Sequence, residues 1–304
     1  MKTELLNLIY KASPMQKKKI EAHFLEIPKM EVELESFLNE YKKFMDIENI
    51  SLPDLANAYK QMLDQFAFTR KEFVTSGQYL TSSQSDAFSD IYDNEEYMTN
   101  YMLALALSQF LWKHHYLIYN FYKSSIINLN QESNILEVGS GHGLFLFEML
   151  KGKNSVNNID IVDISKSSIR MTRNIIKSIN ENILENINFI NIDINKYTSE
   201  ITYDYIIIAE VIEHVENPLK ILKNLYSLLS DDGEIFVTTC VNCPAIDHIY
   251  LFENVGQIQD LIEEAGFEIK TELSVPSEDK SEKYIKKFKV DISYAAILKK
   301  RSNR

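Results

Sequence analysis

The chain has 304 residues, of which 45% are hydrophobic and 25% are charged, as is usual for a globular protein of one large or two modest domains. Its 32 lysines and arginines stand against 44 aspartates and glutamates, which gives a formal net charge of -12. This acidic balance argues against tight binding to a nucleic-acid backbone, because such binding draws its affinity from clustered cations.

Targeting and membrane segments are not evident in the sequence. The first residues lack the apolar stretch of a signal peptide. No uncharged apolar run reaches the length needed to span a membrane. We therefore expect a cytoplasmic protein.

The first part of the chain, residues 1–128, is expected to form an all-helical domain. Pro14 and Pro28 would divide its beginning into separate helices. Ser51-Leu-Pro-Asp54 has the features of a helix start, and apolar residues recur at helical spacing from Leu55 to Phe73. This domain is the natural cover for a ligand site in the rest of the chain.

A polar loop and a long helix complete this domain. The stretch from Gly77 to Ser89 is polar and is expected to be a loop. A single helix is predicted from Glu95 to Tyr122, and it is apolar nearly all round. We therefore expect this helix to be buried between other elements, with most of its tyrosines serving as core packing.

From Asn134 the pattern changes to short strands that alternate with helices, which predicts a parallel sheet with covering helices. Asp231-Asp232-Gly233 predicts a turn before the fifth strand. The predicted strands are 134–139, 158–164, 187–193, 203–210 and 233–240, and the predicted helices are 143–151, 165–180 and 217–230.

The end of the chain departs from this alternation. A helix from Val255 to Ala265 is predicted to end at Gly266. Two β-like runs, Phe267–Val275 and Ser281–Leu298, predict an antiparallel hairpin joined by a polar loop. The expected fold class is therefore α/β: a Rossmann-like, doubly wound, mostly parallel sheet with a C-terminal antiparallel hairpin in residues 129–304, preceded by the helical domain.

The most informative stretch runs from Asn134 to Gly143. An apolar run breaks into Gly139, Gly141 and Gly143, and an apolar helix pattern follows at once. Glycines allow a sharp turn and a close approach of the backbone to a ligand, because they lack Cβ. In open α/β sheets, ligands bind at this edge, outside the carboxyl ends of the strands. The pattern therefore predicts a nucleotide-like site.

Acidic residues end the next three predicted strands. Asp163 would be able to accept hydrogen bonds from both hydroxyls of a ribose, and Asp193 from an exocyclic amine, while Glu210 ends the fourth strand. A single acid at a strand end is more often a helix cap than a ligand contact. Three such acids after a glycine-rich turn favour a nucleoside ligand.

In these residues the chain resembles the class I S-adenosylmethionine-dependent methyltransferases. The resemblance covers about residues 134–300 and includes the segment from Glu210 to Pro218 and the closing hairpin. It implies S-adenosylmethionine as cofactor, with the glycines behind the methionine part, Glu137 orienting the turn or the amino group, and two isoleucines enclosing the adenine. The implied cofactor-binding residues are Glu137, Gly139, Gly141, Gly143, Asp163, Ile164, Asp193, Ile194 and Glu210.

Two histidines are candidates for the chemistry of transfer. His214 follows Glu210 and Glu213 at spacings that put the three side chains on one side of a turn, and His248 comes shortly after the fifth strand. In this family these two strand ends normally frame the acceptor pocket. We expect His214 or His248 to act as general base for a hydroxyl or amine.

The same residues also resemble a metal site. Glu210, Glu213, His214 and His248 are similar to the metal ligands of small-RNA 2′-O-methyltransferases, and part of the set recurs in ubiquinone-pathway O-methyltransferases. Oxygen and imidazole ligands suit Fe²⁺ or Zn²⁺ better than Mg²⁺ or Mn²⁺. The pattern is also widespread in the family without metal, so we do not favour a divalent metal.

Two further pairs of residues can be interpreted in more than one way. His114 and His115 are neighbours on a predicted helix and would point about 100° apart, so only one would face a pocket. His115, near Gln109 and Trp112, is either a satisfied buried histidine or a contact to the acceptor. The single C-x-x-C pair of Cys240 and Cys243 is expected to be incidental or to line the pocket, because a zinc site normally needs four ligands.

The function implied by the resemblance is methyl transfer to the O, N or C of a small molecule, in specialised metabolism. We expect a small-molecule acceptor, no nucleic acid and no membrane, and a homodimer through the long helix would be compatible with the sequence. Three alternatives stay open. They are internal cyclisation of S-adenosylmethionine with release of methylthioadenosine, metal-dependent RNA 2′-O-methylation, and a non-enzymatic cofactor-binding partner protein.

Overall fold

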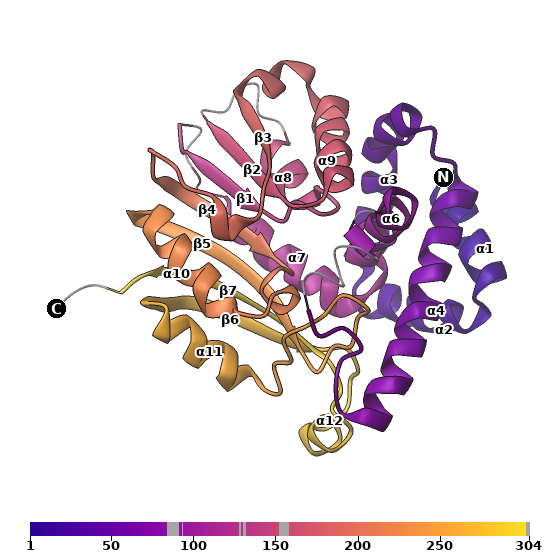
Figure 1. The fold of residues 1–304 in the computed structure, drawn as a ribbon. Coiled ribbons are helices and arrows are strands. Elements are labelled where there is room, and N and C mark those ends of the chain that lie inside the picture. Colours follow the sequence, from indigo (N-terminus) through magenta and orange to yellow (C-terminus); the bar gives the residue numbers. More distant parts are fainter. Residues whose placement is uncertain (84–90, 93, 128, 130–131, 152–157, 302–304) are drawn as a thin grey trace.

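A computed structural model describes residues 1–83, 91–92, 94–127, 129, 132–151 and 158–301. A layer of N-terminal helices lies beside an open sheet that has helices on both faces (Figure 1). The helices are α1 (Lys2–Ala12), α2 (Pro14–Glu26), α3 (Pro28–Glu48), α4 (Leu52–Ser76), α6 (Glu95–Leu111), α7 (Lys113–Ser125), α8 (Leu144–Leu150), α9 (Lys166–Ile179), α10 (Pro218–Leu228), α11 (Val255–Glu264) and α12 (Glu282–Phe288). The strands are β1 (Ile135–Val138), β2 (Ile159–Asp163), β3 (Ile187–Asn191), β4 (Tyr203–Ala209), β5 (Leu229–Val241), β6 (Phe267–Pro276) and β7 (Ile292–Lys300).

The beginning of the chain is divided into helices as predicted. Pro14 and Pro28 are the first residues of α2 and α3, where the missing N–H costs no helical hydrogen bond. The start of α4 is a capping box, in which the backbone N–H of Asp54 donates to Ser51 Oγ and the N–H of Ser51 donates to Asp54 Oδ2. Residues 77–83 contain neither helix nor strand, as expected, and residues 84–89 of the predicted loop lie outside the described residues.

The prediction of one helix from Glu95 to Tyr122 is wrong, because α6 and α7 meet at Trp112. Trp112 has an extended backbone, with φ -105° and ψ 124°. Its indole N–H donates to Tyr59 Oη at 2.7 Å, and His23 Nδ1 donates to the Leu111 carbonyl at 3.1 Å. These partners come from α2 and α4, so the helical periodicity of the segment gives no sign of the break. α6 itself is buried nearly all round, as predicted.

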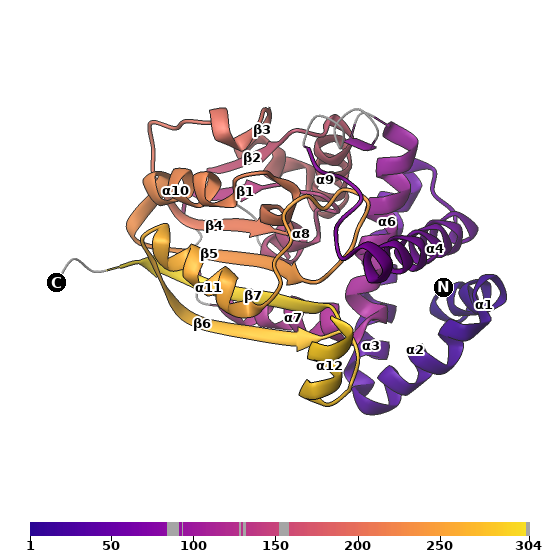
Figure 2. The ribbon, with the colours of Figure 1, turned by 60° about the horizontal axis from the view of Figure 1, so that its bottom comes forward.

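The sheet has the expected class of topology. Its strand order is β3-β2-β1-β4-β5-β7-β6, in which the first five strands are parallel. β7 lies antiparallel to both β5 and β6, which confirms the C-terminal hairpin (Figure 2). The chain reverses its winding direction at β1 and β4, and this is where ligands bind in doubly wound sheets.

Two predictions about the later strands are wrong. β5 begins at Leu229, so the expected turn at Asp231-Asp232-Gly233 lies inside a strand. The pairing steps from Leu229 opposite Tyr203 to Glu234 opposite Tyr205, so the extra residues are accommodated as an irregularity in the ladder.

The expected β-run from Ser281 to Leu298 is a strand only in its second half. Its first half is α12, which begins where the Tyr284 N–H donates to Ser281 Oγ. The rings of Tyr284 and Phe288 lie 4.5 Å apart, one helical turn from each other. None of the residues of α12 is buried, so no core contact marks this helix in the sequence pattern.

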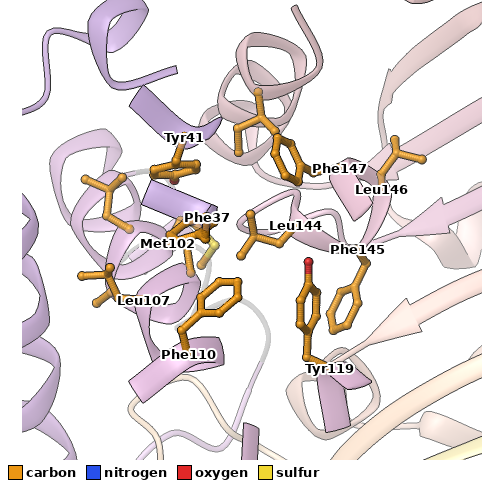
Figure 3. Packing of buried hydrophobic residues seen from close by; sticks show 14 of the residues in the cluster. Phe37, Tyr41, Met102, Leu107, Phe110, Tyr119, Leu144, Phe145, Leu146 and Phe147 are labelled. Carbon is orange, nitrogen blue, oxygen red and sulfur yellow. The ribbon is translucent and has the colours of Figure 1, made fainter. Parts of the chain in front are cut away.

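One apolar core joins the helical layer to the sheet. α7, α8 and α9 cover one face of the sheet, and α10 and α11 cover the other. Aromatic rings form a chain of contacts from α3 through α6 and α7 to α8: Phe37–Phe110 at 4.5 Å, Phe110–Tyr119 at 5.6 Å and Tyr119–Phe145 at 6.1 Å (Figure 3). The helical layer is therefore packed firmly against the sheet rather than tethered to it.

α7 packs directly on the sheet. Its Tyr122 donates a hydrogen bond to the Phe145 carbonyl at 2.8 Å and contacts the Phe236 ring at 4.8 Å. The boundary at residues 128 and 129 therefore separates segments that share one core, and it stays a prediction. None of the helices in the described ranges is long and apolar enough to cross a bilayer.

Candidate active site

A cavity of about 480 Å³ lies between the carboxyl edge of the sheet and the helices α4, α6 and α7. The glycine turn after β1 and the acids after β2 and β3 line it. The segments after β4 and β5 line the same cavity. Its volume is within the range of small-molecule sites. The strand-end residues predicted separately from the sequence thus share one space.

The glycine turn has the backbone conformation that only glycine adopts without strain. Gly139, Gly141 and Gly143 have φ values of 70°, 49° and 68°. A Cβ on Gly139 would lie 2.4 Å from Val211 Cγ2, so glycine is needed at this position for packing as well. Gly139 and Gly141 line the cavity, whereas Gly143 packs against Thr172 of α9.

Asp163 connects β2 to the glycine turn. Its Oδ1 accepts from the Ser165 N–H at 2.7 Å, and its Oδ2 accepts from Ser140 Oγ at 3.3 Å and from the Gly141 N–H at 3.5 Å. Burial raises the pKa of Asp163, and these donors oppose that rise. The carboxyl group is thus held at the edge of the cavity by the turn itself.

Asp193 and the two predicted isoleucines lie farther along the same edge. Asp193 Oδ1 accepts from the backbone N–H of Asn195 at 2.8 Å, which caps a short 3-10 helix, Ile194–Lys196. Asp193, Ile164 and Ile194 all line the cavity. The structure therefore brings these three residues together with Asp163 and the turn.

Glu137 lies beneath the turn, outside the cavity lining. Its side chain is 1% exposed, and its Oε2 has no hydrogen-bond partner among the described residues. Burial and the nearby Asp163 carboxylate raise the pKa of Glu137 to about 8. Its suggested contact with the amino group of a cofactor stays a prediction.

His214 forms an ion pair with Asp247, which is 2% exposed. Its Nδ1 lies 3.3 Å from Asp247 Oδ2 and 3.1 Å from the Asp247 carbonyl. Tyr92 Oη lies 3.1 Å from the same nitrogen and donates to Asp247 Oδ2 at 3.2 Å. Burial alone would lower the pKa of His214, but the Asp247 carboxylate outweighs it and raises the pKa to about 9. The same pairing lowers the pKa of Asp247 to about 2, against the effect of its burial.

His248 packs edge-on against His214, with ring centroids 4.7 Å apart and an interplanar angle of 88°. Its Nδ1 lies 2.6 Å from the Cys243 carbonyl, which only accepts, so Nδ1 carries the proton and Nε2 has a free lone pair. Burial and the neighbouring charge on His214 lower the pKa of His248. The two histidines therefore differ in charge at neutral pH.

The acids after β4 are packed under these histidines. Glu213 is fully buried, its Oε2 accepts from Thr239 Oγ1 at 2.7 Å, and its Oε1 has no partner among the described residues. Glu210 opens into the cavity and has a φ of 51°, a strained conformation for this residue type that is typical of functional sites. Burial and the Glu213 carboxylate raise the pKa of Glu210 well above its ordinary range.

All four residues of the predicted metal set lie in this cluster. Donor atoms of Glu213, His214 and His248 lie within 4.8 Å of one another. Two further groups include the cysteines, which line the cavity as free thiols: Cys240, Cys243 and His248, and Glu210, Glu213 and Cys240.

The histidine pair at the start of α7 also borders the cavity. Both His114 and His115 line it, so the expectation that only one would do so is wrong. α7 begins directly after the break at Trp112, so both histidines lie in its first turn. His115 Nδ1 donates to Ser108 Oγ at 2.7 Å, since that hydroxyl itself donates to the Leu105 carbonyl. Burial lowers the pKa of His115 to about 3, so this imidazole is neutral.

Asp247 and Tyr92 are the site residues that the sequence reasoning missed. Asp247 immediately precedes His248, and an Asp-His pair after a strand is a signal that would have singled it out. Tyr92 belongs to none of the motifs recognised in the sequence. Its role depends on a hydrogen bond to His214, 122 residues away, which no local pattern reveals.

The comparisons with known proteins agree with this geometry. Residues 136–235 match the family model described as "Methyltransferase domain". "Malonyl-[acyl-carrier protein] O-methyltransferase 1" of Ilyobacter polytropus is 31% identical over 112 residues, which are 37% of this chain and 40% of that protein. The chain therefore matches about two fifths of the length of this relative.

Solved structures share the fold over a larger part of the chain. The N-methyltransferase NodS from Bradyrhizobium japonicum WM9, in complex with S-adenosyl-L-homocysteine, has a TM-score of 0.51 at 12% identity and covers 73% of this chain and 100% of its own. PigF with S-adenosyl-L-homocysteine has a TM-score of 0.56 at 14% identity and covers 82% of this chain and 74% of its own. Residues 136–235 are therefore similar to a methyltransferase domain, and the glycine turn, the strand-end acids and the strand order lie within the fold that this chain shares with these solved structures.

Proposed function

We propose that this protein transfers the methyl group of S-adenosylmethionine to the O, N or C of a small molecule held in the cavity, in a reaction of specialised metabolism. One observation carries the proposal. The glycine turn and the His214–Asp247 pair line the same cavity, which has the helical layer as its other wall. Cofactor-binding groups and a candidate base thus face one enclosed space.

The residues at the cofactor end fit S-adenosylmethionine. Gly139 and Gly141 line the cavity and carry no Cβ, which lets a ligand approach the backbone of the turn. Asp163 and Asp193 line the cavity, and we expect Asp163 to hold the ribose hydroxyls and Asp193 to accept from the adenine amine. Ile164 and Ile194 offer apolar surface for the adenine ring. Bound there, the cofactor supplies an electrophilic methyl group.

His214 is our choice for the general base. Asp247 and Tyr92 fix its Nδ1, so its Nε2 is the atom that would take the acceptor's proton. His214 can take a proton only in its neutral form, which is the minor form at neutral pH because the pKa of its conjugate acid is about 9, so its capacity as a base increases as the pH rises toward 9. The chain otherwise contributes positioning and exclusion of water, because transfer requires the reacting atoms to lie in line. His248, with its free Nε2, would position the acceptor, and His115, whose pKa is too low for a base, would contact it.

A metal-assisted reaction is the second candidate. The fully buried Glu213 Oε1 has no partner among the described residues, and it lies 4.0 Å from His214 Nε2. Activity that survives removal of divalent metals by EDTA, with the metal content of the protein measured in parallel, would eliminate this candidate. Activity lost with EDTA and restored by one metal would favour it over the base mechanism.

The test of the proposed function is product analysis by mass spectrometry. The purified chain is incubated with S-adenosylmethionine alone, and then with a panel of small metabolites. We expect S-adenosylhomocysteine and a methylated product only when an acceptor is present. Methylthioadenosine formed without any acceptor would establish internal cyclisation instead. Absence of cofactor binding by calorimetry would refute the proposal, and binding without any product would favour the non-enzymatic alternative.

A further inference from the structure

The charges that line the cavity limit the kind of acceptor that fits there. Asp247, which is 2% exposed, lines the cavity, and the fully buried Glu213 lies outside the lining, with its Oε1 4.0 Å from His214 Nε2. Among the described side chains of this part of the lining, the cationic one is protonated His214, which is already paired with Asp247 at 3.3 Å. An acceptor that brought a carboxylate or phosphate into this region would meet further negative charge.

The lysine and arginine side chains that line the cavity are not available to pair with an anionic acceptor. Among the described residues that line the cavity, these are Lys19 and Arg70. The Arg70 guanidinium donates to the carbonyls of Phe288 at 2.7 Å and Lys289 at 2.8 Å, so it ties α4 to the loop before β7. Lys19 is an exposed residue of α2, where water screens its charge. A buried anion without a cation partner is strongly disfavoured.

The helical wall offers apolar surface and neutral hydrogen-bonding groups. Leu63 and Phe66 of α4, Leu105 of α6 and Trp112 supply the apolar part. Gln109 is 7% exposed and lines the cavity with its neutral amide. His115 lines it as well, and its Nε2 is left as an acceptor because Nδ1 donates to Ser108. These groups recognise a polar but uncharged substituent.

We infer that the enclosed part of the acceptor is an uncharged, largely apolar molecule, with its nucleophilic hydroxyl or amine toward His214 and a neutral hydrogen-bonding group toward Gln109. This inference rests on the proposed function. It excludes acceptors that bury a free carboxylate or phosphate, a malonyl group among them. Gln109 is the residue that would set this preference on the helical side of the cavity.

The experiment compares matched pairs of probes that differ in charge but hardly in shape. The pairs are 4-hydroxybenzamide with 4-hydroxybenzoate, and indole-3-carboxamide with indole-3-carboxylate. Binding of each to the full-length chain saturated with S-adenosylhomocysteine is measured by ligand-observed NMR titration. We expect each amide to bind at least tenfold more tightly than its carboxylate. Equal or tighter binding of the carboxylates, or binding of no probe at all, would overturn the inference.

Substitution of Gln109 provides the second arm. Gln109→Arg places a cation in the cavity wall and is expected to reduce or reverse the preference for the amides. Gln61→Arg adds the same charge to an exposed position of α4 and should leave the preference unchanged. The same change of preference in both variants would overturn the role of Gln109.

Binding of S-adenosylhomocysteine is measured first and separately. Its absence would refute the proposed function, whereas a reversed probe preference with the cofactor product bound would refute only this inference.

Discussion

Replacing Asp247 with asparagine should change the charge of His214 at physiological pH. The substitution keeps the shape of the side chain and removes the carboxylate that lies 3.3 Å from His214 Nδ1. The pKa values of about 9 for His214 and about 2 for Asp247 correspond to an interaction of about 2 to 3 kcal/mol, at 1.36 kcal/mol per pKa unit. Without that carboxylate, burial dominates, and the pKa of His214 should fall from about 9 to 6.5 or below, by at least about 2.5 units.

The assay is an NMR titration of the histidine ring protons in the wild-type chain and in Asp247→Asn. His214 should titrate near pH 9 in the wild type and near or below pH 6.5 in the variant. Asp260→Asn, an exposed position on α11, is the matched control and should leave the titration unchanged. A wild-type His214 that titrates at or below pH 6.5, or an unchanged titration in Asp247→Asn, would refute the reasoning.

The same pair also affects stability as a function of pH. The raised pKa of His214 contributes free energy of unfolding that is fully present below about pH 6.5 and is lost as the pH rises through about 9. The lowered pKa of Asp247 contributes stability that is present above pH 3.8 and is lost as the pH falls through about 2. Asp247→Asn should therefore flatten the decline in stability between pH 6.5 and 9.

Three further substitutions test the turn, the acid beneath it and the start of α4. Gly139→Ala forces a Cβ to within 2.4 Å of Val211 Cγ2 at a positive φ and so displaces the turn, and calorimetry should show at least a tenfold weaker affinity for S-adenosylhomocysteine. An unchanged affinity would contradict the proposed role of the turn in binding the cofactor. Glu137 has a pKa raised to about 8, so it contributes stability below pH 4.5 that is lost as the pH rises through 8. Glu137→Gln should therefore raise the free energy of unfolding at pH 7 by up to about 3 kcal/mol and have little effect at pH 4. A loss of stability at pH 7 would show that the ionised group is needed. Ser51→Ala removes the capping box and should lower the free energy of unfolding by about 1 kcal/mol, which calorimetry would show as a melting temperature lower by about 2–4 °C. An unchanged melting temperature would mean that the start of α4 is held by packing alone.

Local signals predicted much of the fold because they act over a few residues. The prolines that open α2 and α3, the capping box at Ser51 and the glycine at the end of α11 each satisfy groups within one helical turn. The break at Trp112 was not predictable in this way, because its hydrogen bonds come from Tyr59 and His23. The same holds for β5, where pairing with β4 and β7 overrides the turn propensity of Asp231-Asp232-Gly233.

The residues of the candidate site fall into the same two groups: those that a local signal in the sequence reveals, and those whose contacts depend on distant parts of the chain. Residues at the ends of parallel strands meet at one edge of the sheet, so Asp163, Asp193 and Glu210 could be placed together from the sequence. Asp247 could be singled out only by its place beside His248, and Tyr92 by no local pattern, because their contacts with His214 depend on how the loop after β5 and the segment before α6 fold over the strand ends. The neutral state of His115 likewise follows from its burial, which its position in the sequence does not reveal.

The central claim is that the cavity is an S-adenosylmethionine site whose reactive end faces His214. A crystal structure with S-adenosylhomocysteine tests it most directly. We expect the ribose at Asp163, the adenine beside Asp193 and Ile194, and the sulfur between the glycine turn and His214. A ligand bound outside this cavity, or a sulfur directed away from His214, would contradict the account.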